Sequence, residues 1–296
     1  MSTVALPPGV MGLHALPADH HDGPWDSMVV PPGTRERLLG AAILVLRHGR
    51  RLTSLAGAPH GLIVIAGPPG TGKTTLAQGL AQAAARQLAP RGATTLVEVD
   101  PHAFPSDLLG ESQRGISRLF TETLTELAAR RPHTVVLVDE VESLAVRRST
   151  ASFDTNPVDV HRATDAVLQG LDTLRASCPH VLLVATTNFL EAVDEAVLSR
   201  ADLVHRTTLP DEATAEEILR SSLSELAANW PGLRRLAEDR FLHAKLAGRC
   251  VGLDGRRIRK TVLASLAGRL DVALDPERLT AEDLLEAAES AAAEPS

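Results

Sequence analysis

Short apolar runs separated by amphipathic stretches fill the first two thirds of the chain. The runs at 61–67, 94–100, 133–140 and 180–188 have the composition of buried strands, because a strand covered on both faces is apolar along its length. A fifth short strand is predicted at 202–209. Helical spacing of apolar residues marks 34–49, 73–89, 113–130 and 159–175. Strands that alternate with helices predict an α/β fold, with a five-stranded parallel sheet covered on both sides.

The strand pattern stops after Pro210. Beyond it, the segments 212–228, 233–247, 255–270 and 280–292 all have helical spacing. The first 24 residues contain Pro, Gly and His without any period. We therefore expect a flexible N-terminal tail (1–24), a large α/β domain (25–209) and a small helical domain (210–296).

Composition narrows the function classes. Aromatic residues make up 2% of the chain and the formal net charge is −7, so base-stacking surfaces and a chain-wide basic field for nucleic acid are not expected. Cys178 and Cys250 form no CxxC motif. No signal peptide is visible, and the longest apolar runs are shorter than the roughly 20 residues that a membrane span needs. We expect a cytoplasmic protein that makes no contact with membranes.

A glycine-rich motif follows the first apolar run and opens the next helix. The stretch "GPPGTGKTT" fits the pattern G-x-x-x-x-G-K-[ST], in which backbone N–H groups surround phosphate oxygens at a helix N-terminus. Lys73 would reach the β- and γ-phosphates of ATP, and the hydroxyl of Thr74 would bind Mg²⁺. The predicted ATP-binding residues of this loop are Gly67, Pro68, Pro69, Gly70, Thr71, Gly72, Lys73, Thr74 and Thr75.

Polar residues end two further strands. Asp139 and Glu140 end the run "VVLVDE". We expect Asp139 to hold Mg²⁺ through water and Glu140 to polarise the attacking water. Asn188 ends the run "VLLVATTN" and would help to orient that water, although a turn-forming Asn is the ordinary alternative.

Two arginines complete the candidate catalytic set. Arg200, in "LSRADL", is placed to enter the site of a neighbouring subunit as an arginine finger. The alternative is a surface ion pair with Asp194 or Glu195. Arg256 follows a glycine turn at a helix start and would point to the γ-phosphate. It belongs to the basic cluster 256–260, for which a DNA-binding patch or a solvated helix face are alternatives.

Together these motifs resemble those of AAA+ ATPases, with a P-loop domain followed by a helical lid. Further stretches resemble the pachytene-checkpoint branch, whose members remodel HORMA-domain proteins. They are "WDSMVV", "LVEVDPHAF", "VDEVESLAVRR", "AVLQGLD", "SRADL" and "GLDGRRIRK", and they span Trp25 to Leu270.

The resemblance implies a role for each matching residue. Lys73 and Thr74 would bind ATP and Mg²⁺, with Asp139 supporting the metal. Glu140 would be the catalytic carboxylate and Asn188 the first sensor. By the same resemblance, Arg200 is the finger, Arg256 the second sensor, and Val29 with Val30 the linker that packs near the adenine.

The resemblance also implies a homo-hexameric ring that threads its client through a pore. The loop "FPSDLLGES" lies where the family carries its first pore loop, so Leu108 and Leu109 would grip the client. The family usually has an aromatic residue there. The alternative is that both leucines pack against their own domain. The polar stretch 145–162 would line the pore as a second loop.

A short segment precedes Trp25, whereas eukaryotic relatives have a sizeable N-terminal domain. The chain therefore resembles a minimal bacterial form, as found with HORMA proteins and cGAS-like nucleotidyltransferases in CBASS anti-phage systems. We expect it to disassemble a HORMA–enzyme complex. The alternatives are a general unfoldase that serves a protease and a nucleotide-switched DNA-associated module, the latter supported only by the basic cluster.

Overall fold

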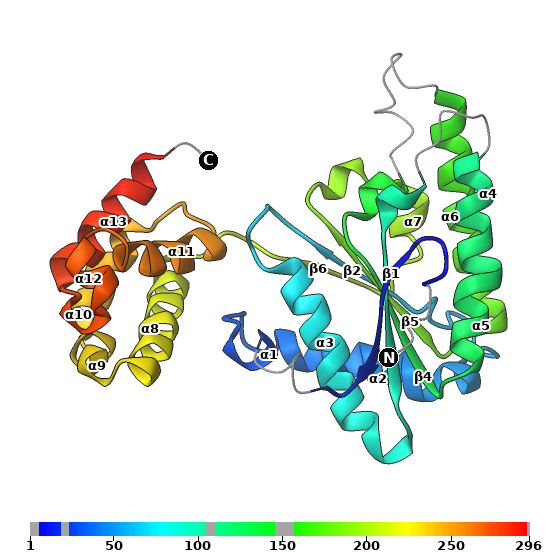
Figure 1. The fold of residues 1–296 in the computed structure, drawn as a ribbon. Helices are drawn as coiled ribbons and strands as arrows, with labels where there is room; N and C mark the ends of the chain where they lie inside the picture. The colour runs from blue at the N-terminus through cyan, green and yellow to red at the C-terminus, as the bar shows by residue number, and fades with distance from the viewer. Residues whose placement is uncertain (1–5, 19–23, 105–110, 146–156, 295–296) are drawn as a thin grey trace. The chain divides into compact units, whose positions relative to one another are not determined.

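Six strands form one mixed sheet in the order β1-β3-β4-β5-β2-β6 (Figure 1). The computed structural model describes residues 6–18, 24–104, 111–145 and 157–294. Strands β2 to β6 run parallel to one another, and β1 is antiparallel to β3. The strands are β1 (Val10–Leu16), β2 (Leu62–Ala66), β3 (Thr94–Val99), β4 (His133–Val138), β5 (Val181–Thr187) and β6 (Leu203–Arg206).

The prediction of five strands was one short, because β1 lies in the segment expected to be a flexible tail. Apart from His14, its residues are apolar or glycine on both faces, so the sequence shows no polar–apolar alternation that would reveal a strand, although Val10 and Leu16 are buried. The edge of β3 supplies the backbone hydrogen-bonding partner of this strand. The five parallel strands are those that the apolar runs predicted.

Polar side chains anchor the N-terminal segment to α3 (Lys73–Leu88). Glu98 of β3 accepts a hydrogen bond from Gln78 Nε2 (3.0 Å) and lies 3.1 Å from His14 Nε2. The buried Gln82 amide accepts from the N–H of Ala18 (3.1 Å) and donates to its carbonyl (2.8 Å). Strand β1 is thus held by side chains as well as by its backbone pairing.

Helices cover both faces of the sheet. The helices α2 and α3 lie on one face, and α4, α5 and α6 lie on the other (Figure 1). A π-helical turn, Leu119–Thr123, joins α4 to α5. The helices before β6 are α1 (Pro24–Ser27), α2 (Thr34–Leu52), α3, α4 (Glu111–Arg118), α5 (Leu124–Ala129), α6 (Pro157–Ser177) and α7 (Glu195–Leu198).

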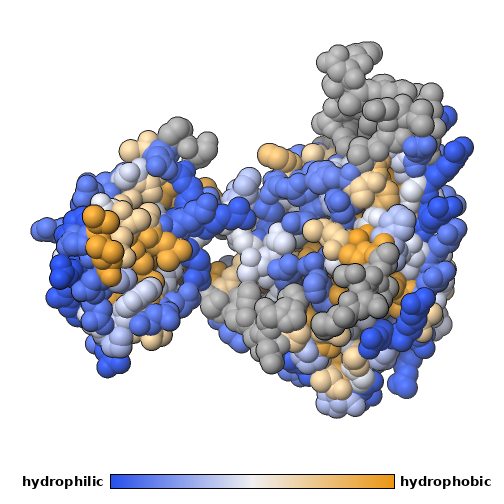
Figure 2. Space-filling model, in the orientation of Figure 1, coloured by the Kyte–Doolittle hydropathy of each residue, from blue (hydrophilic) through white to orange (hydrophobic). Residues whose placement is uncertain are grey.

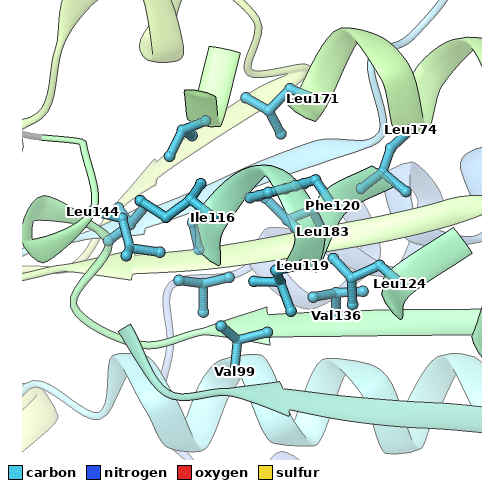
Figure 3. Close-up of a cluster of buried hydrophobic side chains, with 14 of the residues drawn as sticks. Val99, Ile116, Leu119, Phe120, Leu124, Val136, Leu144, Leu171, Leu174 and Leu183 are labelled. Atoms are coloured by element: carbon cyan, nitrogen blue, oxygen red, sulfur yellow. The ribbon is translucent and has the colours of Figure 1, made fainter. Parts of the chain in front are cut away.

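The larger core lies between the sheet and helices α4 to α6 (Figure 3). Phe120, 2% exposed, packs against α6 at Gly170. A Cβ added to Gly170 would lie 2.5 Å from Cγ of the Phe120 ring. The glycine therefore allows α6 to approach the π-helical turn closely.

The described residues form two compact units. The first contains residues up to Asp26, Pro32–Gly67 and Lys73–Thr207, and the second contains Ser27–Pro31, Pro68–Gly72 and the chain from Thr208 onward. The helices of the second unit are α8 (Glu212–Asn229), α9 (Arg234–Ala237), α10 (Arg240–Arg249), α11 (Gly255–Ser265), α12 (Leu270–Leu274) and α13 (Ala281–Ala293).

The second unit has an aliphatic core of its own, to which α8, α10, α11 and α13 contribute. Each of the helices α8, α10 and α11 begins with an aspartate, Asp211, Asp239 or Asp254, whose carboxylate accepts N–H bonds from the first turn. Some apolar side chains stay at the surface, among them Phe241, and Figure 2 shows apolar areas on this unit. No helix among the described residues is long and apolar enough to cross a bilayer.

Candidate nucleotide site at the carboxyl edge of the sheet

The phosphate-binding motif forms the turn between β2 and α3. Gly70 (φ 75°) and Gly72 (φ 84°) adopt left-handed backbone conformations that favour glycine. Within the second unit, a Cβ on Gly72 would lie 2.6 Å from Cε of Met28. The hydroxyl of Thr71 donates to the carbonyl of Pro68 (2.8 Å) and closes the turn. This backbone fits a phosphate cradle, since only small residues let the chain turn so tightly.

Helix α3 begins at Lys73, which is 7% exposed. The first turn of α3 contains no acidic residue. A cation at a helix N-terminus is unfavourable, because that end already carries partial positive charge. A buried lysine in this position therefore fits an anionic ligand such as a triphosphate, whose charge would offset both.

The end of β4 is joined to the start of α3 through Asp139. Its carboxylate accepts hydrogen bonds from the hydroxyl of Thr74, at 2.9 Å to Oδ1 and 3.0 Å to Oδ2. The hydroxyl of Thr186 on β5 also donates to Asp139 Oδ1. A hydroxyl and a carboxylate side by side form the hard oxygen donor set that Mg²⁺ prefers. The residues present therefore fit a magnesium ion.

Glu140 has a strained backbone. With φ 55° and ψ 54°, it is the non-glycine residue with positive φ among the described parts of the chain. Its N–H donates to the Thr186 hydroxyl (3.2 Å). Its side-chain Oε1 accepts from Nδ2 of Asn188 (3.2 Å), and its Oε2 lies 3.5 Å from Nε2 of His102. Such strain persists where surrounding contacts fix the residue, often at functional sites.

Asn188 is held by a second carboxylate. Its backbone N–H donates to Oε1 of Glu142 (3.1 Å), while its side chain reaches Glu140. Glu142 belongs to the 3₁₀ turn Val141–Ser143 that follows the strand-end pair. These hydrogen bonds connect the end of β4 to the end of β5. Glu140, the predicted catalytic carboxylate, and Asn188, the predicted first sensor, are therefore in direct contact.

Arg200 is paired with a carboxylate that the sequence did not suggest. Its guanidinium makes a two-bond contact with Asp172 of α6, with Nε–Oδ1 and Nη2–Oδ2 both at 2.9 Å. Its Nη1 donates to the carbonyl of Ala196 (3.0 Å). The hydrogen bond from Arg200 lowers the pKa of Asp172, and Asp172 raises the pKa of Arg200.

The second unit contains Val29 and Arg256, which were predicted to contact the nucleotide, and the rest of the basic cluster 256–260. Val29 packs against the lid core. Arg256 is exposed at the start of α11, and its N–H donates to the carbonyl of Gly70 (3.3 Å). In the basic cluster, Arg257 donates to carbonyls at the end of α13, and Arg259 pairs with Glu225. Two of the four charges therefore serve the lid itself, which weakens the DNA-patch alternative.

The predicted pore-loop residues Leu108 and Leu109 lie outside the described residues, as does most of the second loop. Just before them, Phe104 is buried at 8% exposure. Its ring packs against Gly9 at the start of β1 and against Gly115 of α4.

Sequence reasoning missed several residues of the site. Thr186 is two positions before Asn188 in "ATTN", and His102 follows the end of β3 in "VDPHAF". Both could have been found from the rule that ligands bind at the carboxyl ends of parallel strands, since these ends meet at one edge of the sheet. Asp172 gives no such signal, because it lies within a helix.

A parallel sheet with a glycine-rich loop after one strand (β2), and an acidic pair after a second strand (β4) that β5 separates from it, defines the class of P-loop nucleotide hydrolases. Residues 63–209 match the model of the ATPase family associated with various cellular activities (AAA). The chain is 43% identical over 283 residues to CD-NTase-associated protein 6 of Pseudomonas aeruginosa, covering 96% of this chain and 92% of that protein. The chain therefore belongs to the AAA family of ATPases, and it is a nucleotide-binding ATPase by that membership.

Two further comparisons give a relative and a solved structure to which the chain is similar. The pachytene checkpoint protein 2 homolog of Oryza sativa subsp. indica is 36% identical over 215 residues, which cover 72% of this chain and 45% of that protein. The chain thus spans about half the length of this relative. The structure of the E. coli MS115-1 HORMA:CdnC:Trip13 complex matches the fold with a TM-score of 0.73 at 18% identity, covering 94% of each chain.

Proposed function

We propose that this chain is an ATP-driven ring remodeller that unfolds or disassembles HORMA-domain protein complexes. Through that action it would regulate a cGAS-like nucleotidyltransferase in CBASS anti-phage defence. The observation that carries the proposal is the 43% identity to CD-NTase-associated protein 6 over nearly the whole of both chains. The similarity to pachytene checkpoint protein 2 and the shared fold with a protein of a HORMA complex support the client class.

Each residue of the site has a proposed task in hydrolysis. Lys73 and the glycine-rich loop would bind the phosphates of ATP, while Thr74 and Asp139 would hold Mg²⁺, which supplies charge neutralisation at the β- and γ-phosphates. Glu140 would accept a proton from the attacking water. Asn188, which donates to Glu140 Oε1 in the structure, would keep that carboxylate and the water in line.

The remaining tasks require neighbouring subunits. We propose a homo-hexamer in which Arg200 of one subunit completes the site of the next, where an arginine finger stabilises the charge of the transition state. Val29, Val30 and Arg256 of the second unit would contact the nucleotide. Leu108 and Leu109 would grip the client by apolar contact, each contributing about 1.5–3 kcal/mol when buried.

Steady-state ATP hydrolysis tests the proposal directly. The purified chain is assayed with Mg²⁺, with and without a HORMA-domain protein encoded beside its gene. We expect the HORMA protein to raise the rate severalfold. Glu140→Gln is the inactive control, because the amide retains an oxygen that can accept from Asn188 yet cannot take a proton from water.

Two outcomes would separate the parts of the proposal. Hydrolysis that responds equally to the HORMA protein and to an unrelated folded protein would keep the ATPase and reject the client. Degradation of a model substrate by an added protease, dependent on this chain, would instead favour the general unfoldase.

A further inference from the structure

The guanidinium of Arg200 is held more firmly than a surface arginine usually is. Asp172 binds it through two parallel N–H···O bonds of 2.9 Å, and the carbonyl of Ala196 accepts a third bond at 3.0 Å. The Arg200 side chain is 24% exposed. Two-bond contacts between arginine and a carboxylate fix the plane of the guanidinium as well as its position.

These three bonds still leave part of the guanidinium available. Arginine carries five N–H donors, and three are engaged by Asp172 and Ala196 within the described residues, so two remain. One of the two remaining N–H groups is on Nη1 and the other is on Nη2, the terminal nitrogens of the side chain. A phosphate oxygen could accept from them while the contact with Asp172 stays intact.

The loop that carries Arg200 is fixed at its other end too. The carboxylate of Asp202 accepts three backbone N–H bonds, from His60 (2.8 Å), Gly61 (2.7 Å) and Leu62 (3.1 Å), at the start of β2. The backbone of this short loop is therefore held at β2 through Asp202, and the side chain of Arg200 is held at α6 through Asp172. Catalytic groups act best when supporting residues hold them in place.

We propose that Asp172 is a positioning residue of the ATPase, which holds the guanidinium of Arg200 in the orientation that serves the neighbouring subunit's site. This inference rests on the finger role of Arg200 in the proposed function. Without Asp172, the long side chain would sample several rotamers and would contact the transferred phosphate for only part of the time. A misplacement of about 1 Å can cost on the order of 100-fold in rate.

The test compares hydrolysis and nucleotide binding in full-length variants. We expect Asp172→Ala to lower kcat about tenfold to 100-fold with the Kd for ATP unchanged, because its own phosphate loop is intact. Arg200→Ala should lower kcat further, since fingers contribute roughly 1,000-fold or more. Asp172→Glu should recover part of the loss. Asp271→Asn is the matched control, because Asp271 forms the same kind of two-bond contact with Arg269 in the lid.

The double variant separates positioning from a structural role. If Asp172 acts through Arg200, then Asp172→Ala has no further effect on kcat when Arg200 is already alanine. An additive loss in the double variant, or unchanged hydrolysis in Asp172→Ala, would overturn the inference. Thermal unfolding checks folding, and Asp172→Asn replaces the alanine variant if the latter is unstable.

Mixtures of variant and unaltered subunits show in which subunit's site the loss of Asp172 lowers hydrolysis. Subunits that carry Lys73→Ala cannot hydrolyse ATP at their own site. A second substitution in these subunits can therefore change hydrolysis only at the site of a neighbouring subunit. When mixed with unaltered chains, Lys73→Ala/Asp172→Ala subunits should lower total hydrolysis more than Lys73→Ala subunits do. Equal hydrolysis in the two mixtures would contradict the inference. If Arg200→Ala alone kept full activity, the finger role itself would fail, which is a different result.

Discussion

At the scale of single residues, the strained backbone of Glu140 is the feature most open to measurement. Its φ of 55° places a side chain where L-residues rarely lie. The contacts with Thr186, Asn188 and His102 keep the residue there. This backbone strain lowers the free energy of unfolding, and in the proposed mechanism the benefit is a carboxylate held in one position at the carboxyl edge of the sheet.

Glu140→Gly should therefore be more stable than Glu140→Ala by about 1 kcal/mol. Both variants lose the same side-chain contacts, but only glycine adopts the left-handed conformation freely. Urea unfolding at equilibrium gives the two free energies, and both variants should be inactive in hydrolysis. Equal stability would mean that Glu140 does not hold this conformation in solution.

At the scale of elements, the contact of α6 with the π-helical turn links the core to Arg200, the proposed finger. Gly170 meets the ring of Phe120, and Asp172 follows two positions later on the same helix. Any shift of α6 away from Phe120 would also move the carboxylate that binds Arg200.

Gly170→Ala should lower the free energy of unfolding by about 1–3 kcal/mol, because the new methyl group cannot fit against Phe120. The matched control is Gly40→Ala in α2, where an added Cβ meets nothing within 4 Å. That change should stabilise the chain by roughly 0.5–1 kcal/mol through helix propensity. Chemical denaturation measures both. A neutral Gly170→Ala would show that α6 can move away at no cost.

At the scale of the whole molecule, buried and half-buried histidines couple stability to pH. Burial lowers the pKa of four histidines of the first unit below the usual value of about 6.5, with nearby arginines adding to the effect: His60, His133, His180 and His205. As pH falls below that value, the unfolded chain binds protons that the folded chain excludes. The free energy of unfolding therefore decreases.

We expect a lower urea midpoint for the first unit at pH 5.5 than at pH 7.5. The difference between the two pH values should shrink in His180→Gln, because glutamine does not titrate and His180 is 5% exposed beside Arg50. A midpoint that is the same at both pH values would contradict the pKa directions.

The sequence by itself determined the parallel sheet, the phosphate loop and the acidic pair. Each depends on neighbouring residues in the chain: apolar runs of strand length, a glycine-rich turn opening α3, and carboxylates directly after β4. Local patterns of this kind persist in any fold that buries those strands, so they can be read without the structure.

Only the tertiary structure decided how these parts meet. Strand β1 became part of the sheet because β3 offered an edge that no local pattern predicts. Arg200 met Asp172, 28 residues away, because α6 packs against α7, which Arg200 follows. His102, Thr186 and Glu142 joined Glu140 and Asn188 because parallel strands end at one edge. Contacts between distant residues depend on packing, which the order of residues does not display.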